Sequence, residues 1–495
     1  MKNFIKKYAC VAVMAVSALT SCDLDSKVYS SLSDSNFPQT EEDARLLITG
    51  IYGNFKCNSG GVNNSSINGV WAWPIFGTGE GWWGLSTQTT DECFSLEKHG
   101  WQEFAWGSAL DTYSTYTNSR NITRCTKILD AIDHMTGISE QTRNQLIAET
   151  KCLRGWLMFH FYDLYGPVPF TTDPSKIDEV KYEPRPTKEV YFAQMTKDLE
   201  EAMPYLYDKT NGTSNWGRVN KGLCNMLLMK LYMNDHQWDK ALTYAKKLMT
   251  MGYSLADNYF DVFNQEENNE NIWSVPSGPQ MGNEWFFYAI PPDCSNVCGQ
   301  EVNPCWGVLQ MPWDFYDTFA DCDKRKAGIS DHYDGTDGKL KTRNGDKGTR
   351  LMYGAIVVKY FYDKDRMMAG DIPLVVCRYA DVLLSMAEIL NNLNGPSQEA
   401  LNYVKQITDR AGTTSTIPAD VLSSKEKFNE FLLAERGREL YWEGWRREDL
   451  IRFGKYIETG LKRGFPAKDH MVLFPIPPRV ITESGGVVKN NPGYE

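Results

Sequence analysis

Helix-spaced apolar residues run through most of this chain, and the spacing is lost over two long stretches, 58–106 and 253–378. Apolar side chains that recur every three or four residues are typical of helices that bury one face. The helical segments begin at Thr40, around Ile122, at Ser139 and at Thr187, and continue at 218–234, 238–251, 379–394, 397–411 and 425–453. This pattern predicts a mostly α-helical protein with two irregular insertions.

The predicted helices fall into pairs. Residues 218–234 and 238–251, for example, form a predicted hairpin whose second arm ends at Gly252. Pairs of about 34 residues are typical of tetratricopeptide repeats, although the repeat consensus is degenerate here. We predict that residues 40–495 form one domain around this helical scaffold.

Tryptophan and glycine are concentrated in the two irregular stretches. Residues 71–106 contain six of the 15 tryptophans, four of them in the string VWAWPIFGTGEGWW (70–83). The second stretch contains Trp273, Trp285, Trp306 and Trp313. Loops longer than about 15 residues are usually functional or disordered, and tryptophan-rich segments are rarely disordered. The two insertions are therefore predicted to carry the functional surface.

The first 22 residues have the pattern of an export signal. Three lysines precede the apolar stretch 8–19, which is too short to span a bilayer. The string LTSC, which ends at Cys22, resembles a bacterial lipobox, in which cleavage before the cysteine is followed by lipidation of its thiol. The alternative is an ordinary signal peptide with an incidental cysteine. We predict a signal peptide over residues 1–21 and a flexible tether over 22–39, anchored through the lipid on Cys22.

The net charge bears on the class of ligand, and the cysteine spacing bears on disulfide and zinc sites. The net charge is −11, and loss of the three lysines of the signal lowers it to −14, which argues against a nucleic-acid ligand. Cys294, Cys298 and Cys305 lie close together in a loop, where an exported protein can form a local disulfide. Zinc is less favoured there, because the spacing is not CxxC and no histidine is near.

No catalytic or cofactor motif is recognisable. The six histidines are scattered, and no HExxH, GxSxG or phosphate-binding loop is present. Residues 331–338 (DHYDGTDG) do not fit a calcium-binding EF-hand loop, so we predict a solvated turn, and a structural calcium has no support. Glycoside hydrolase carboxylates pair in space rather than in sequence, so that class stays as a less favoured alternative. We predict a protein that is not an enzyme and needs no cofactor.

Several strings along the chain resemble, in order, the signatures of the SusD/RagB family of cell-surface nutrient-binding lipoproteins of Bacteroidetes. Besides the lipobox, they are LRGWLMFHFYDLYGPVPF (153–170), RYADVLLSMAEILNN (378–392), ALNYVKQITDRAG (400–412), ERGRELYWEGWRREDLIRFG (435–454) and LFPIPPRVI…NNPGYE (473–495). The ordered set is more specific than any single string. The last string departs from the family in one respect. Its Asn-Pro pair comes late in the segment, whereas family members more often have this pair early.

The resemblance implies both a fold and a partner. The implied fold is a scaffold of four tetratricopeptide-like helical pairs, with loops and small β elements on one side. The implied partner is a SusC-like TonB-dependent transporter of the outer membrane, which the lipoprotein covers and supplies with oligosaccharide or, in some members, peptide. We therefore expect a cell-surface glycan-binding lipoprotein. A peptide receptor of the RagB type is the alternative, and a helical scaffold with no small ligand would leave the tryptophan-rich loops unexplained.

The tryptophans of the insertions are the candidate ligand-binding residues. An exposed indole offers a flat apolar face to the C–H face of a pyranose, and its N–H lies at the rim. Burying about 100 Å² in this way is worth roughly 2–3 kcal/mol, so two or three such platforms with a few hydrogen bonds give millimolar to micromolar binding. The predicted ligand-binding set is Trp71, Trp73, Trp82, Trp83, Trp101, Trp285 and Trp306. The alternative for each of them is packing that holds its own loop in place.

Trp82 and Trp83 are adjacent, so in an extended segment they would point to opposite sides. On that geometry we expect one of them to bind ligand and the other to pack. Polar partners for sugar hydroxyls are sought among Glu80, Asn68, Asp91, Gln102 and Asn283, with no ranking between them. For Asp91, a role in capping its loop is at least as well supported as a ligand contact.

The charged residues near the C-terminus alternate in sign on one predicted helix. Such alternation is typical of a salt-bridged helix face, so we interpret these residues as structural rather than catalytic. They are Arg436, Arg438, Glu439, Glu443, Arg446, Arg447 and Asp449.

Overall fold

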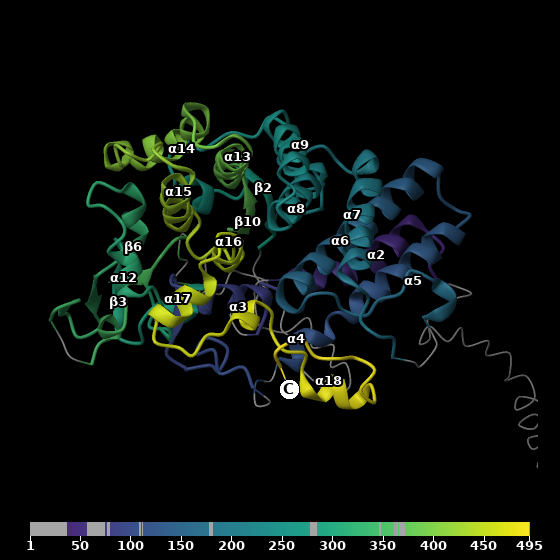
Figure 1. The fold of residues 1–495 in the computed structure, drawn as a ribbon, viewed down its shortest axis with the longest axis horizontal. Helices are drawn as coiled ribbons and strands as arrows, with labels where there is room; N and C mark the ends of the chain where they lie inside the picture. The colour runs from purple at the N-terminus through teal and green to yellow at the C-terminus, as the bar shows by residue number, and fades with distance from the viewer. Residues whose placement is uncertain are drawn as a thin grey trace, which may run out of the picture.

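The computed structural model describes residues 37–56, 75–76, 80–107, 110, 112–177, 182–277, 285–345, 348–360, 362, 365 and 372–494. Helices dominate the fold (Figure 1). The long helices are α2 (Glu41–Tyr52), α5 (Arg120–His134), α6 (Glu140–Tyr165), α7 (Lys188–Ala202), α8 (Lys221–Asn234), α9 (Trp238–Met249), α13 (Tyr379–Asn394), α14 (Gln398–Ala411) and α15 (Lys425–Leu440). The short ones are α3 (Trp82–Gln88), α4 (Tyr113–Thr117), α10 (Asp261–Asn264), α11 (Trp285–Ala289), α12 (Trp313–Tyr316), α16 (Arg446–Arg452), α17 (Tyr456–Lys462) and α18 (Pro478–Glu483).

The long helices pack against their neighbours in chain order. Helix α5 lies against α6, α6 against α7 and α8 against α9, and α13 packs on α9, α14 and α15. In Figure 1 the series runs from α2, α5, α6 and α7 on the right to α13, α14 and α15 at the upper left. The predicted mostly α-helical fold with neighbouring helical pairs is confirmed.

Polar side chains begin several of these helices where the sequence predicts it. The hydroxyl of Thr40 accepts a hydrogen bond from the Asp43 amide (3.2 Å), and the Asp43 carboxylate accepts one from the Thr40 amide (3.0 Å). This reciprocal capping box satisfies two amides that the first helical turn leaves without partners. Ser139 and Thr187 cap α6 and α7 in the same position, each with its hydroxyl on a backbone amide.

The strands of the described part form four small antiparallel sheets, and nine of its ten strands lie within residues 253–378. They are β1 (Phe94–Ser95), β2 (Asn271–Val275), β3 (Cys294–Val297), β4 (Gln300–Glu301), β5 (Leu309–Gln310), β6 (Ile329–Ser330), β7 (His332–Gly335), β8 (Leu340–Thr342), β9 (Ile356–Val357) and β10 (Leu374–Arg378). Strands β2 and β10 form a buried pair, and β10 leads directly into α13. The other sheets are β4-β3-β7-β8, β1-β5 and β6-β9.

The prediction of one helix over 425–453 is wrong, because the chain breaks between α15 and α16. Trp442 and Gly444 adopt positive φ values of 58° and 86°, which end the helical path. A Cβ atom at Gly444 would lie 2.6 Å from the ring of Trp82 and 2.9 Å from that of Trp83. The break therefore makes room for the two indoles of α3, which lies beside α16 (Figure 1).

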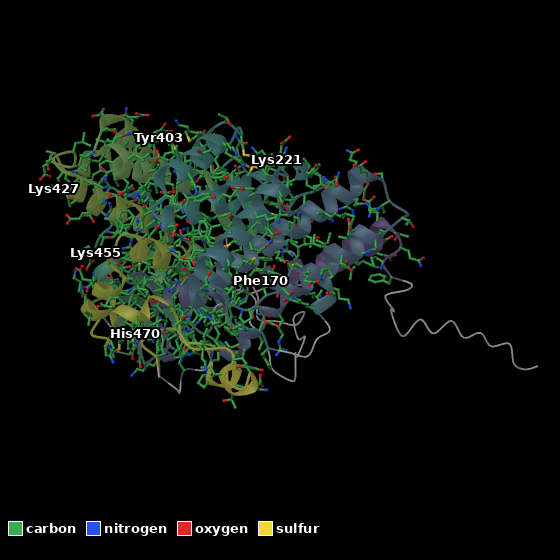
Figure 2. All side chains as sticks on the ribbon, turned by 45° about the vertical axis from the view of Figure 1, so that its right-hand side comes forward. Phe170, Lys221, Tyr403, Lys427, Lys455 and His470 are labelled. Atoms are coloured by element: carbon green, nitrogen blue, oxygen red, sulfur yellow. The ribbon has the colours of Figure 1, made fainter. Side chains whose placement is uncertain are left out.

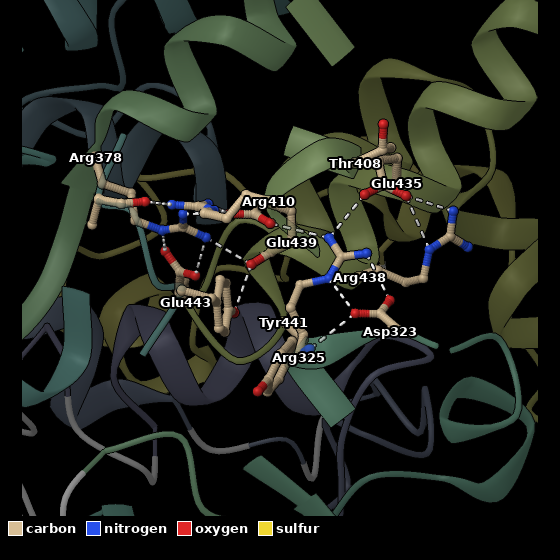
Figure 3. A network of polar contacts seen from close by, with 12 residues as sticks. Asp323, Arg325, Arg378, Thr408, Arg410, Glu435, Arg438, Glu439, Tyr441 and Glu443 are labelled. Atoms are coloured by element: carbon tan, nitrogen blue, oxygen red, sulfur yellow. Dashed lines mark hydrogen bonds and ion pairs between the residues drawn. The ribbon is translucent and has the colours of Figure 1, made fainter. Parts of the chain in front are cut away.

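A buried network of ion pairs surrounds the end of α15 (Figure 3). Arg378 of β10 donates to the carboxylates of Glu439 (2.6 Å), Glu443 (2.8 Å) and Glu270 (2.8 Å), and it is 1% exposed. Arg325 makes a second centre, 2.8 Å from Glu435 and 3.0 Å from Glu439. The predicted pairing and structural role of these charges fit this arrangement. The pairs do not run along one helix face, as the sequence predicted. They lie in the core and join α15 to strands and loops of the second insertion.

A second set of buried charges joins α8, α13, α15 and α16. Arg436 bridges Asp381 (2.7 Å) and Asp449 (2.8 Å), and Lys230 lies 2.8 Å from Asp381. All four side chains are at most 1% exposed. Buried ion pairs contribute little net stability over apolar packing, but removing one partner is costly. The charged C-terminal string therefore fixes how the scaffold helices and the second insertion fit together.

Other charged side chains lie at the surface, among them Lys427 and Lys455 (Figure 2). Lys455 pairs with Glu458 at 2.8 Å, and Lys427 pairs with Asp420. None of the helices in the described ranges combines the length and the apolar character that crossing a membrane requires. The predicted signal peptide, Cys22 and most of the tether lie outside the described residues.

Candidate functional site

The two insertions meet at a short antiparallel sheet. Strand β1 of the first insertion pairs with β5 of the second, with Phe94 opposite Gln310 and Ser95 opposite Leu309. The amide of Leu96 also donates to the carbonyl of Val308 (2.8 Å). Residues about 210 positions apart in the sequence are thereby held side by side. The segment that follows β4 and leads into β5 contains Trp306.

Trp306 is the tryptophan with the greatest exposure in the described part of the chain, at 53%. Its amide donates to the carbonyl of Phe287 in α11 (2.9 Å). The indole lies 5.1 Å, centre to centre, from the ring of Phe287 and 5.8 Å from that of Tyr288, both of which are half-buried. Rigid support from two aromatic neighbours leaves the outer part of the indole free to contact a ligand.

A turn from a third segment completes this surface. The guanidinium of Arg350, at the start of the 3-10 helix η5 (Arg350–Met352), lies with Nη2 3.4 Å from the carbonyl oxygen of Trp306. The same turn exposes Met352 (52%) and Tyr353 (46%). We call Phe287, Tyr288, Trp306, Arg350 and Tyr353 the Trp306 surface. It joins aromatic groups, a cation and exposed apolar area, which is a composition suited to binding rather than to catalysis.

The expectation that Trp82 or Trp83 contacts ligand is wrong. Both are 1% exposed. The indole N–H of Trp82 donates to Asp163 (2.9 Å), and its ring packs edge-on against Trp445 at 5.0 Å. Trp83 donates to the carbonyl of Trp442 (3.4 Å). The segment is helical rather than extended, so the two side chains do not point to opposite sides, and the break after α15 covers both of them.

Trp101 is also a packing residue in this structure, with 8% exposure. The ring of His99 stacks on one face of the indole at 4.1 Å, and the indole N–H donates to Gln88 (3.1 Å). His99 lies 3.0 Å from the carboxylate of Glu97, and burial lowers the pKa of His99 despite this partner. The face of Trp101 that His99 covers is closed to a sugar ring.

The remaining predicted tryptophans are not placed. Trp71 and Trp73 lie outside the described residues, and the side chain of Trp285, which begins α11, does too. Phe287 and Tyr288, which support Trp306, were not among the predicted residues. The aromatic run WFFY at 285–288 was a usable signal for them.

Two polar residues proposed for sugar hydroxyls hold the loop instead. Arg446 of α16 binds Asp91 through two hydrogen bonds of 2.7 Å. Burial raises the pKa of Asp91, but the adjacent guanidinium outweighs it and the pKa is lowered. The side-chain amide of Gln102 bonds both the N–H and the carbonyl of Ser95 (2.7 Å each), which fixes β1. Both residues position the first insertion against the scaffold.

Residues 331–338 were considered for calcium, and the three loop cysteines were considered for a disulfide or zinc. Residues 331–338 form β7 and the turn into β8, where Asp337 bonds Lys341 (2.9 Å), in agreement with the predicted turn. Cys294, Cys298 and Cys305 are free thiols in this structure, so the local disulfide considered for them is not formed. Within the described ranges, no three histidine, cysteine or acidic side chains are grouped in a way that would hold a metal ion.

Glu92 is an unusual neighbour of Asp91, because it is completely buried and neither carboxylate oxygen has a hydrogen-bond partner among the described residues. Burial raises the pKa of Glu92 well above its ordinary value, and the nearby Arg446 guanidinium offsets this only in part. Glu92 is therefore protonated when folded over a range of pH in which it is ionised when unfolded.

Replacing Glu92 by glutamine is expected to stabilise the protein increasingly as the pH rises. The carboxyl's contribution to stability is fully present below the unfolded pKa of about 4.3 and is lost as the pH rises through the raised folded pKa, by at most about 1.4 kcal/mol per pH unit. Glutamine does not titrate, so the variant lacks this loss. Urea unfolding at pH 5, 7 and 9 measures the difference in free energy of unfolding between the two proteins. A stability difference that stays constant across these pH values would contradict the assignment.

Comparisons with known proteins agree with the fold. Residues 329–464 match the model of the SusD family, and residues 86–221 match a model described as starch-binding associating with outer membrane. A SusD-like protein P25 from Formosa agariphila is 25% identical, covering 91% of this chain and 90% of that protein. The starch-binding protein SusD from Bacteroides thetaiotaomicron is 25% identical over the whole of both chains.

Solved structures give the same result. Surface glycan-binding protein A from Bacteroides thetaiotaomicron, in complex with laminarihexaose, superimposes with a TM-score of 0.70 at 17% identity, over 91% of this chain and 99% of the other. The SusD relative and the surface glycan-binding protein are named as binding proteins rather than enzymes, in agreement with the prediction. The ordered strings, the two matching models and the shared fold agree: over most of its length the chain is similar to proteins of the SusD/RagB family.

Proposed function

We propose that this protein is a cell-surface glycan-binding lipoprotein that captures oligosaccharide and delivers it to a SusC-like TonB-dependent transporter in the outer membrane. One observation carries the binding part of this proposal. Trp306 is 53% exposed and is supported by Phe287 and Tyr288 on a surface where the two insertions meet. The relatives named as starch-binding and glycan-binding support a carbohydrate as the ligand.

The delivery part of the proposal rests on the N-terminal sequence and on the family. The lipobox ending at Cys22 would tether the fold to the outer membrane through residues 22–39. The description of one matching model as outer-membrane-associating supports this location. A tethered receptor that hands its ligand on needs moderate affinity, which agrees with a binding surface built from few aromatic platforms.

The exposed indole of Trp306 can supply part of the binding free energy. Stacking one pyranose on Trp306 would bury about 100 Å² of apolar area, worth roughly 2–3 kcal/mol. Millimolar affinity needs about 4 kcal/mol, so Trp306 has to act together with other groups of the surface. Tyr353, at 46% exposure, presents a second ring with a polar hydroxyl.

Trp306→Ala is expected to weaken glycan binding at least tenfold, because it removes the largest apolar contact of the surface. Calorimetry and affinity electrophoresis of the wild-type protein against a polysaccharide panel first identify a ligand, and the variant is then measured with it. Tyr205→Ala is the control, since Tyr205 is equally exposed (53%) but lies in the 3-10 helix η3 (Met203–Tyr205) that follows α7. Affinity within twofold of wild type for Trp306→Ala would remove this residue from the binding site.

A further inference from the structure

A basic segment leads to the Trp306 surface. Residues 339–350 contain five lysines and arginines and one acidic residue, a net charge of +4 within a chain whose net charge is −11. The segment includes β8 and ends at Arg350, whose guanidinium contacts the carbonyl of Trp306. A local excess of positive charge in an acidic protein concentrates anions near it.

Two cations of this segment are already neutralised by carboxylates. Lys341 pairs with Asp337 at 2.9 Å. Arg343 binds both carboxylate oxygens of Asp317, at 2.7 and 2.9 Å, and its guanidinium lies over the ring of Trp313 at 4.1 Å. These two side chains therefore have limited capacity for a further anion.

Arg350 differs from them in its contacts. Within the described ranges no carboxylate pairs with its guanidinium, and its one hydrogen bond, from Nη2 to the carbonyl of Trp306, is long at 3.4 Å. The side chain is half-buried, so it is partly desolvated and still reachable by a ligand. A guanidinium in this state can offer two parallel N–H donors to a carboxylate or sulfate group.

We propose that the Trp306 surface binds an anionic glycan, with a carboxylate or sulfate group on Arg350 and a neighbouring pyranose stacked on Trp306. This inference rests on the proposed glycan-binding function and specifies its substrate class. The two contacts act on different parts of the ligand, since the indole binds the apolar ring face and the guanidinium binds the charged substituent. A neutral glycan would satisfy only the first of them.

The test titrates the purified full-length protein with three oligosaccharides of equal length: a neutral glucan, an oligogalacturonate and a sulfated oligosaccharide. We expect at least one anionic ligand to bind at least tenfold more tightly than the neutral one at 50 mM NaCl, and this advantage to shrink at 500 mM because salt screens the exposed pair. Tighter binding of the oligogalacturonate identifies the anion as a carboxylate, and tighter binding of the sulfated oligosaccharide identifies it as a sulfate.

Variants of the basic segment then assign the preference to one residue. Arg350→Gln is expected to abolish the anionic preference, because it removes the guanidinium that binds the charged substituent. Arg350→Lys should keep part of the preference, because it keeps the charge but not the two parallel donors. Arg343→Gln is the matched control, with the same change in charge seven residues away, and is expected to keep the full preference.

Three results would overturn the inference. Equal affinity of the wild-type protein for neutral and anionic ligands would show the substrate class to be wrong while the proposed glycan-binding function stands. An equal loss of the anionic preference in Arg350→Gln and Arg343→Gln would show that the preference comes from the overall positive charge of the segment rather than from a contact with Arg350. Failure to bind any glycan, with thermal unfolding showing a folded protein, would overturn both the inference and the proposed function.

Discussion

Replacing Arg378 by methionine is expected to lower the free energy of unfolding by about 3–5 kcal/mol, the range measured when one partner of a buried ion pair is removed. Arg378 is 1% exposed and donates to three carboxylates, those of Glu270, Glu439 and Glu443. It also donates to the backbone carbonyl of Glu439 (2.6 Å). Methionine fills a similar volume but leaves these acceptors buried without their donor.

The loss from Arg378→Met is expected to shrink in acid. Burial raises the pKa of Glu439, but Arg410 and Arg378 outweigh it and hold the pKa of this carboxyl well below its ordinary value. A lowered folded pKa stabilises the protein above the unfolded pKa of about 4.3, and this contribution is lost as the pH falls through the folded value. Removing Arg378 raises the folded pKa, so the variant has less of this stabilisation to lose in acid.

Guanidinium chloride unfolding at pH 7, and at successively lower pH below 4 for as long as both proteins remain folded, measures both effects of Arg378→Met. Arg45→Met is the control, because Arg45 pairs with Glu41 (2.7 Å) on the exposed side of α2, where such a pair is worth at most about 1 kcal/mol. A loss at pH 7 no larger than that of the control would contradict the structural role given to the network.

Gly444→Ala is expected to cost about 2–4 kcal/mol, although it adds a single methyl group. The φ value of 86° is strained for alanine, which accounts for roughly 1 kcal/mol. The added Cβ would lie 2.6 and 3.0 Å from ring carbons of Trp82 and 2.9 Å from a ring carbon of Trp83. Overpacking of this kind costs about 1–3 kcal/mol, and the indoles are held by hydrogen bonds to Asp163 and to the carbonyl of Trp442.

Gly395→Ala separates the two causes. Gly395 ends α13 with a φ of 81°, close to that of Gly444, but a Cβ there would meet nothing within 4 Å. Chemical unfolding of this variant should therefore show only the backbone cost of roughly 1 kcal/mol. Equal losses for the two glycine variants would show that Trp82 and Trp83 do not pack tightly on the break between α15 and α16.

Local sequence signals predicted the scaffold well and the burial of individual tryptophans poorly. Capping residues such as Thr40 and Ser139 act within one turn of their helix, so the sequence carries the whole signal. The environment of Trp82 and Trp83 depends on Gly444, some 360 positions further along the chain. No local pattern reports such a contact, so two buried indoles were predicted to include a ligand-binding residue.

The charged C-terminal string and the Trp306 surface also depend on contacts between residues far apart in the sequence. Alternating signs in 435–449 indicated ion pairing, but Arg378 and Arg325, the partners that make the network a core feature, come from the second insertion. Trp306 was predicted from its residue type and loop context. Arg350 was not, because only the fold brings it to the Trp306 carbonyl.

A crystal structure of the protein with the best-binding oligosaccharide from the panel shows whether the Trp306 surface is the ligand-binding site. We expect a pyranose ring stacked about 4 Å from the indole of Trp306, beside Tyr353. We also expect Trp82, Trp83 and Trp101 to remain covered by the protein. A sugar bound elsewhere, with the Trp306 surface exposed to solvent, would contradict the claim that this surface is the ligand-binding site.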